Sequence, residues 1–138
     1  MNQKALDLGL LNTHFSNPIG LDERNNYSSA TDIANLGIFL YHSEFIKEAA
    51  KISHLQVSST SGNIKHKLES TNELLDSFLD IRGLKTGKTA SAGLCLVAIA
   101  ANKEGKEIIT VVLNSPARFQ ESKILIDWVF RAYKWNNQ

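Results

Sequence analysis

The segment Ile81–Thr89, which reads Ile-Arg-Gly-Leu-Lys-Thr-Gly-Lys-Thr, constrains the chain more than any other stretch. It gathers two lysines, two threonines and two glycines, and an apolar run over residues 93–100 follows it. Side chains alternate between the two faces of a strand, so an extended backbone places Lys85 and Thr86 on opposite faces. The glycines let another backbone or a ligand approach closely. We therefore expect a binding edge that suits a carboxylate or a phosphate.

Two functional interpretations compete for this segment, beside a solvated hairpin tip without a function. Residues 83–89 nearly match the phosphate-binding pattern G-x-x-x-x-G-K-[ST], but only three residues separate Gly83 from Gly87. A phosphate loop also leads into a helix, whereas an apolar run follows here. Position 114, where a magnesium-binding Asp is expected, carries Asn. Spacing and context therefore disfavour nucleotide binding.

The second interpretation is the Lys-Thr-Gly element of serine acyl-transferases that act on D-alanyl peptides or β-lactams. Other segments match the same family in its order along the chain, and they are residues 1–9, 13–21, 27–32, 72–75, 83–93 and 118–122. On these segments the chain resembles the later part of the catalytic domain of a D-alanyl-D-alanine carboxypeptidase, a low-molecular-weight penicillin-binding protein. The resemblance covers nearly the whole chain.

This resemblance implies a set of substrate-binding residues. Lys85 and Thr86 match the positions that engage the terminal carboxylate of the substrate or of a β-lactam. Gly87 keeps the strand surface open, Thr89 matches a second hydroxyl, and Arg118 resembles the family arginine near the same carboxylate. No metal or other cofactor is implied.

The catalytic residues of the family have no counterpart in the sequence. The family uses a Ser-x-x-Lys element, in which the lysine activates the serine nucleophile. No lysine of the 138 residues has a serine three positions before it. The second family element, Ser-x-Asn, matches formally at 61–63 and 70–72, but both matches stand too late in the chain, and we interpret them as turn residues. Lys88 occupies a position that is commonly histidine in the family and adds a cation there. We expect no acyl-enzyme from the isolated chain.

Hydrophobic periodicity and turn residues predict an α+β fold in which a hairpin precedes a three-strand antiparallel meander. The expected helices cover residues 2–10, 28–40, 44–51 and 119–133, the hairpin covers 52–57 and 64–68, and the strands cover 81–89, 93–101 and 107–113. The resemblance implies a partial penicillin-binding or β-lactamase-like transpeptidase fold. Residues 1–138 then form one incomplete catalytic domain, with a mostly helical and loop part over 1–80 and the Lys-Thr-Gly sheet with its closing helix over 81–134.

Two packing expectations follow from the apolar residues near the carboxyl end. The last helix is expected to lay one stripe across the meander, made of Ile124, Leu125, Trp128, Val129 and Ala132. The one cysteine, Cys95, lies within an apolar run and is expected to be a buried, inert thiol.

Composition limits the classes of partner. A formal net charge of +1 and a pI near 7.9 give no electrostatic footprint for nucleic acid. Neither a signal pattern nor a transmembrane stretch stands out, although the resemblance places the parent family in the cell envelope. It also implies a peptidoglycan stem peptide or a β-lactam as ligand. We further expect strand 107–113 to pair with a missing amino-terminal fragment or with itself. The alternative function is a non-catalytic module that binds D-alanyl peptides or proteins through the same strand.

Overall fold

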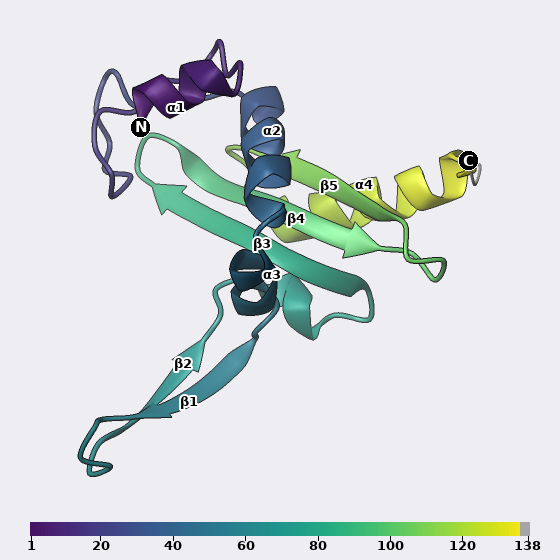
Figure 1. Cartoon of the computed structure of the whole chain (residues 1–138). Coiled ribbons are helices and arrows are strands. Elements are labelled where there is room, and N and C mark those ends of the chain that lie inside the picture. The colour runs from purple at the N-terminus through teal and green to yellow at the C-terminus, as the bar shows by residue number, and fades with distance from the viewer. Residues whose placement is uncertain (136–138) are drawn as a thin grey trace.

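The computed structural model describes residues 1–135 (Figure 1). Strands β3, β4 and β5 form an antiparallel sheet in sequence order, and β1 and β2 form a separate hairpin. This α+β architecture confirms the predicted hairpin and meander. The elements are α1 (Asn2–Asp7), α2 (Ala30–Tyr41), α3 (Glu44–Ala50), β1 (His54–Ser58), β2 (Lys65–Glu69), the 3-10 helix η1 (Glu73–Asp76), β3 (Asp80–Thr89), β4 (Gly93–Ala101), β5 (Glu107–Val112) and α4 (Arg118–Ala132).

The meander carries one long helix on each face. α2 crosses one face over β4 and β5, and α4 lies against the same two strands from behind, as Figure 1 shows. Gly37 of α2 is buried at the crossing, where a Cβ atom would lie 2.6 Å from Ile109 Cδ1 and 3.5 Å from a methyl carbon of Val97. The missing side chain therefore allows the helix to approach the sheet closely.

The core lies between the sheet and α4. Its buried members come from η1, β3, β4 and α4, and they are Leu74, Ile81, Leu96, Ala98, Ala100 and Ile126. Leu96 and Ile126 retain no exposed surface. Burial of one such side chain contributes roughly 1.5–3 kcal/mol to stability. Ile81 thus anchors β3, the strand of the Lys-Thr-Gly segment, in this core.

The inward face of α4 differs from the predicted one. Ile124, Leu125 and Trp128 of the predicted stripe are 58%, 38% and 55% exposed. The side chains that are buried or packed on the core recur at spacings of three and four, and they are Phe119, Ser122, Ile126 and Phe130. The prediction was wrong because the buried face includes a polar residue, Ser122. The outward face carries as many large apolar residues, so the hydrophobic pattern did not distinguish the two faces.

The start of α2 is held by two polar side chains. Ser29 caps the helix, because its hydroxyl accepts a hydrogen bond of 3.2 Å from the Asp32 backbone nitrogen. Asp32 is only 4% exposed. Its carboxylate accepts bonds of 2.8 Å from the Asn12 backbone nitrogen and 2.7 Å from Thr13 Oγ1. The carboxylate thus ties the preceding loop to the first turn of α2.

Some element bounds differ from the predicted ones. α1 ends at Asp7 rather than at residue 10, and Gly9 after it has a φ of 69°, which favours glycine and leaves the helical conformation. β5 ends at Val112, one residue early, and α4 begins at Arg118, one residue early. These differences leave the topology unchanged.

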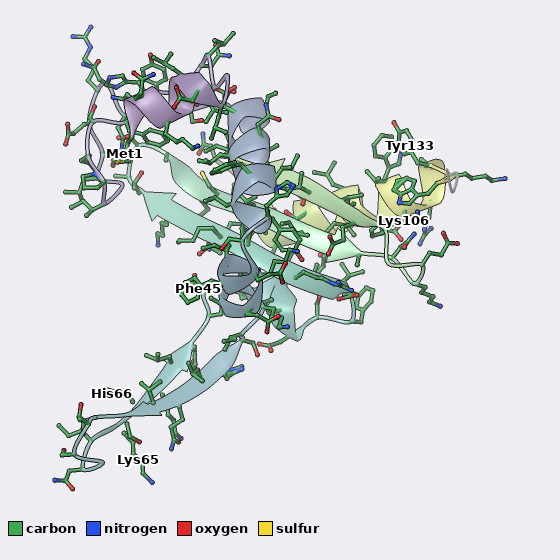
Figure 2. All side chains as sticks on the ribbon, in the orientation of Figure 1. Met1, Phe45, Lys65, His66, Lys106 and Tyr133 are labelled. Carbon is green, nitrogen blue, oxygen red and sulfur yellow. The ribbon has the colours of Figure 1, made fainter. Side chains whose placement is uncertain are left out.

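The β1–β2 hairpin projects away from the rest of the chain. Figure 2 shows Lys65 and His66 far from the sheet. Every residue of both strands is exposed, so the hairpin adds little to the core.

Candidate functional site

The Lys-Thr-Gly segment lies on β3, which pairs with β4 along its length. Lys85 stands opposite Val97 and Thr86 opposite Leu96, so the two side chains occupy opposite faces, as predicted. Lys85 is exposed, whereas Thr86 is 8% exposed. The strand therefore presents a solvated ammonium beside a mostly buried hydroxyl.

A cleft of about 550 Å³ lies beside this segment. One wall is formed by residues 85–87 of β3 and 95–97 of β4, and the other by residues of the loop 22–28 and by Ile33 of α2. The sheet wall contributes a lysine, and the loop wall contributes the carboxylates of Asp22 and Glu23. The cleft thus combines apolar lining with charged groups at its edges.

Cys95 lines the same cleft, contrary to the prediction of a buried thiol. Its side chain is partly exposed, and Sγ donates a bond of 3.4 Å to the Ala92 carbonyl oxygen. Cys95 stands opposite Gly87, and a Cβ atom on that glycine would lie 3.7 Å from Cys95 Cβ. The thiol remains accessible because its cross-strand partner has no side chain to cover it.

The polar groups of Lys85 and Thr86 are engaged within the chain. Lys85 Nζ donates to the Thr86 carbonyl oxygen, and the Thr86 hydroxyl bonds the hydroxyl of Thr71. Both are contacts that an incoming anion can compete with, since a carboxylate is a stronger acceptor than a neutral carbonyl oxygen.

Arg118, the first residue of α4, reaches the same strand. Its Nη1 donates a bond of 3.1 Å to the Gly87 carbonyl oxygen, and its guanidinium carbon lies 4.7 Å from the centre of the Phe119 ring. Arg118 Nε is buried and has no hydrogen-bond partner among the described residues. The structure therefore brings Arg118 against Gly87 of the Lys-Thr-Gly segment, which lies 31 residues earlier in the chain.

Thr89 lies at the end of β3, where the chain turns into β4. Its Oγ1 accepts a bond of 2.9 Å from the Ala92 backbone nitrogen. The turn also contacts Asp22, whose Oδ2 accepts a bond of 3.0 Å from the Ser91 backbone nitrogen. Hydrogen bonds from the Thr89 side chain and the Ser91 backbone hold the pKa of Asp22 below its ordinary value of 3.8.

Sequence reasoning missed Asp22 and Thr71 as neighbours of the candidate residues. Asp22 lies 69 positions before Ser91, so no local pattern signals their contact. Thr71 falls inside the Ser70–Asn72 match, which was interpreted as a set of turn residues. That match does form a turn, because Ser70 Oγ accepts from the Asn72 backbone nitrogen, but the turn lies against β3. The Ser61–Asn63 match lies exposed between β1 and β2.

A second polar group lies at the opposite end of the sheet. Tyr41 of α2 donates a bond of 3.0 Å to Glu107 of β5, and Arg82 of β3 bridges Glu107 at 3.3 Å and Asp80 at 2.8 Å. Burial and the hydrogen bond to Glu107 raise the pKa of Tyr41 to about 12. A cleft of about 600 Å³ opens here beside β5. This network clamps α2, β3 and β5 together.

Within residues 1–135, no group of three or more His, Cys, Asp or Glu side chains is arranged to hold a metal ion. The helices described there include none with the length and apolar character needed to span a membrane.

Comparison with known proteins decides the family. The sequence profile described as D-alanyl-D-alanine carboxypeptidase matches residues 1–117, which is most of the chain. The chain belongs to the D-alanyl-D-alanine carboxypeptidase family. This confirms the resemblance that the Lys-Thr-Gly segment and its companion motifs indicated.

Individual members of the carboxypeptidase family match the chain almost end to end. D-alanyl-D-alanine carboxypeptidase DacA of Haemophilus influenzae is 37% identical over 138 residues, which cover 97% of this chain and 34% of the relative. DacC of Escherichia coli is 39% identical and is covered to 33%. The chain thus spans about a third of the length of these relatives.

Solved structures of this family share the fold. The Streptomyces K15 DD-transpeptidase superposes with a TM-score of 0.86 at 30% identity, covering 94% of this chain and 52% of that one. Penicillin binding protein 5 from Haemophilus influenzae superposes with a TM-score of 0.82 at 34% identity, and the match covers 94% of this chain and 38% of that protein. The chain therefore has the fold of one part of a penicillin-binding catalytic domain, as the resemblance implied.

Proposed function

We propose that this chain is the carboxylate-binding part of a serine-type D-Ala-D-Ala carboxypeptidase that acts on peptidoglycan stem peptides through an acyl-enzyme. The observation that carries the proposal is that an ammonium, a hydroxyl and a guanidinium meet at one strand segment, Lys85–Gly87, which lines the cleft. A peptide that ends in a carboxylate, or a β-lactam, carries the anion that such donors recognise.

The candidate residues have separable roles in this proposal. Lys85 exchanges its bond to the Thr86 carbonyl oxygen for a bond to the ligand carboxylate. The Thr86 hydroxyl donates to the same anion, and Thr89 contributes the second hydroxyl at the end of the strand. Gly87 leaves the strand surface uncovered. Arg118 adds positive charge near the carboxylate while it holds the Gly87 carbonyl oxygen.

The chemical step is assigned to residues outside this chain. An acyl-enzyme needs a serine nucleophile and a base, and the 138 residues contain no Ser-x-x-Lys element. The groups on β3 then bind and orient the substrate, but they have no nucleophile to assist. We propose that the isolated chain is inactive and forms one incomplete catalytic domain, with its sheet part over 81–134 and its helical and loop part over 1–80.

The β5 edge is the proposed contact with the rest of the enzyme. Among the described residues, β5 pairs only with β4, so its outer edge carries unpaired backbone groups. We propose that a missing amino-terminal fragment adds strands here and that, without it, the chain self-associates through 107–113. Sedimentation velocity over a range of concentrations is expected to show association. A strictly monomeric, folded chain at high concentration would count against this part of the proposal.

The function is tested by peptide binding. An acetylated tripeptide that ends in D-alanyl-D-alanine is titrated into isotope-labelled chain, and backbone amide shifts of β3 report the dissociation constant. Lys85→Ala is expected to weaken binding roughly 10-fold or more, the size of one charge-assisted hydrogen bond. Lys65→Ala on the projecting hairpin removes the same charge far from the site and is the matched control. Absence of binding by the unaltered chain, or equal binding by Lys85→Ala, contradicts the proposal.

We propose a location in the cell envelope on the same basis, since the proposed substrate, peptidoglycan, lies there.

The alternative function, a non-catalytic binding module, predicts the same result in the peptide-binding experiment. It differs in acylation: if the chain is only a binding module, adding it to the preceding part of a catalytic domain produces no penicillin label on that part.

A further inference from the structure

The hydroxyl of Thr86 has a partner that neither the family motifs nor the sequence pattern assigns. Thr71 Oγ1 hydrogen-bonds Thr86 Oγ1. Thr86 is 8% exposed, whereas Thr71 lies at the surface. The contact therefore joins the mostly buried hydroxyl of the Lys-Thr-Gly segment to the solvent-facing side of a neighbouring turn.

The turn that carries Thr71 is held on both sides. Before it, the Ser70 backbone nitrogen donates a bond of 2.7 Å to the Ser53 carbonyl oxygen. After it, Asn72 Oδ1 accepts a bond of 3.2 Å from the Leu74 backbone nitrogen, and Leu74 is 1% exposed in the core. The backbone at Thr71 is thus fixed to the hairpin base and to the core, which places its hydroxyl at a defined point beside β3.

We infer that Thr71 is a positioning residue that orients the Thr86 hydroxyl toward a bound carboxylate. A threonine hydroxyl has one donor hydrogen and two acceptor lone pairs. When Thr71 donates to Thr86 Oγ1, the Thr86 hydrogen is free to point at the anion. The two hydroxyls then form a short chain that ends on the carboxylate, and each bond in such a chain strengthens the next.

This inference deepens the proposed function and rests on it for the identity of the ligand. The direct test compares the affinities of Thr71 variants for the acetylated D-alanyl-D-alanine tripeptide. Thr71→Val keeps the shape and removes the hydroxyl, and it is expected to weaken binding about 3- to 10-fold, the size of one neutral hydrogen bond. Thr71→Ser keeps the hydroxyl and is expected to bind within about twofold of the unaltered chain. Thr60→Val, at the exposed tip of the hairpin, is the control for loss of a surface hydroxyl.

A second measurement separates this inference from the proposed function. Side-chain scalar couplings report the χ1 rotamer of Thr86 without any ligand. We expect one rotamer in the unaltered chain and in Thr71→Ser, and rotamer averaging in Thr71→Val. If the unaltered chain binds no peptide, the proposed function fails while the rotamer test still decides the role of Thr71. An unchanged Thr86 rotamer in Thr71→Val, or unchanged peptide affinity in that variant when the unaltered chain binds, overturns the inference.

Discussion

Arg118 Nη1 donates a hydrogen bond of 3.1 Å to the carbonyl oxygen of Gly87, and this bond fastens the first turn of α4 to the Lys-Thr-Gly segment. The two residues belong to different layers of the fold, since β3 lies in the sheet and α4 packs behind it. The bond therefore links the position of a candidate binding strand to the packing of the closing helix.

Replacement of this arginine tests the link. Arg118→Ala is expected to lower the free energy of unfolding by about 1 kcal/mol, below the usual range for a charged hydrogen bond because this bond is exposed to solvent. Amide exchange at residues 87–89 is expected to accelerate. Arg131→Ala, which removes an exposed ion pair with Asp127 on the same helix, is the control and should change neither quantity appreciably. Unchanged exchange in Arg118→Ala would show that the bond does not hold the strand.

Two features require glycine at position 83 of β3: the backbone conformation there and the close approach of Ala50. Its φ of 136° is a conformation that residues with a side chain rarely adopt, and a Cβ atom would lie 2.9 Å from Ala50 Cβ. Gly83→Ala is expected to destabilise the chain by about 2 kcal/mol or more in chemical denaturation. Gly87→Ala on the same strand would place Cβ at an ordinary 3.7 Å from Cys95 and is expected to cost far less. Equal losses for the two variants would contradict this account of β3.

The inward face of α4 is tested by a pair of truncations. Ile126 retains no exposed surface, whereas Ile124 is 58% exposed on the same helix. Ile126→Ala is expected to cost roughly 2–5 kcal/mol of unfolding free energy, and Ile124→Ala less than about 1 kcal/mol. A larger loss of unfolding free energy for Ile124→Ala than for Ile126→Ala would instead support the inward face that the sequence pattern predicted.

The contact between Asp22 and the β3–β4 turn predicts an acid-sensitive feature. The bond from the Thr89 side chain, followed by that from the Ser91 backbone, lowers the pKa of Asp22 below 3.8. A lowered folded-state pKa contributes stability that is present above the unfolded value and is lost as pH falls through the folded value. The contact is therefore intact at neutral pH and is lost only below about pH 4.

Nuclear magnetic resonance titration of the Asp22 carboxyl carbon checks this assignment. Thr89→Val is expected to move the pKa of Asp22 upward toward 3.8, because the first of the two bonds is removed, whereas Thr89→Ser keeps the hydroxyl and the lowered pKa. A pKa that is the same in the unaltered chain and in Thr89→Val would exclude the bond.

The sequence predicted those parts of the fold that local patterns encode. The β3–β4–β5 meander follows from alternating or continuous apolar runs separated by polar turns, and α2 follows from its hydrophobic periodicity. The face of α4 did not follow, because Ser122 is buried among apolar residues and breaks the period on which the prediction depends. The exposure of Cys95 also depends on the absent side chain of Gly87 across the strand, which a single run of residues does not reveal.

The candidate site was predictable as a strand but not as a network. Its motif residues are contiguous, so their alternation on β3 follows from strand geometry. The partners of those residues come from distant segments. Thr71 lies in the turn before η1, Asp22 lies in the loop before α2, and Arg118, which donates to the Gly87 carbonyl oxygen, lies at the start of α4. Such contacts are set by tertiary packing, and no spacing rule in the sequence encodes them.

Labelling with a fluorescent penicillin tests the central claim most directly. The chain alone, incubated with the reagent and separated under denaturing conditions, is expected to carry no covalent label, because the 138 residues contain no Ser-x-x-Lys element. Co-expression with the preceding part of the catalytic domain from a relative such as DacA of Haemophilus influenzae is expected to give label on that partner and none on this chain. Covalent label on this chain alone would contradict the claim that it is the carboxylate-binding part of a catalyst whose nucleophile lies elsewhere.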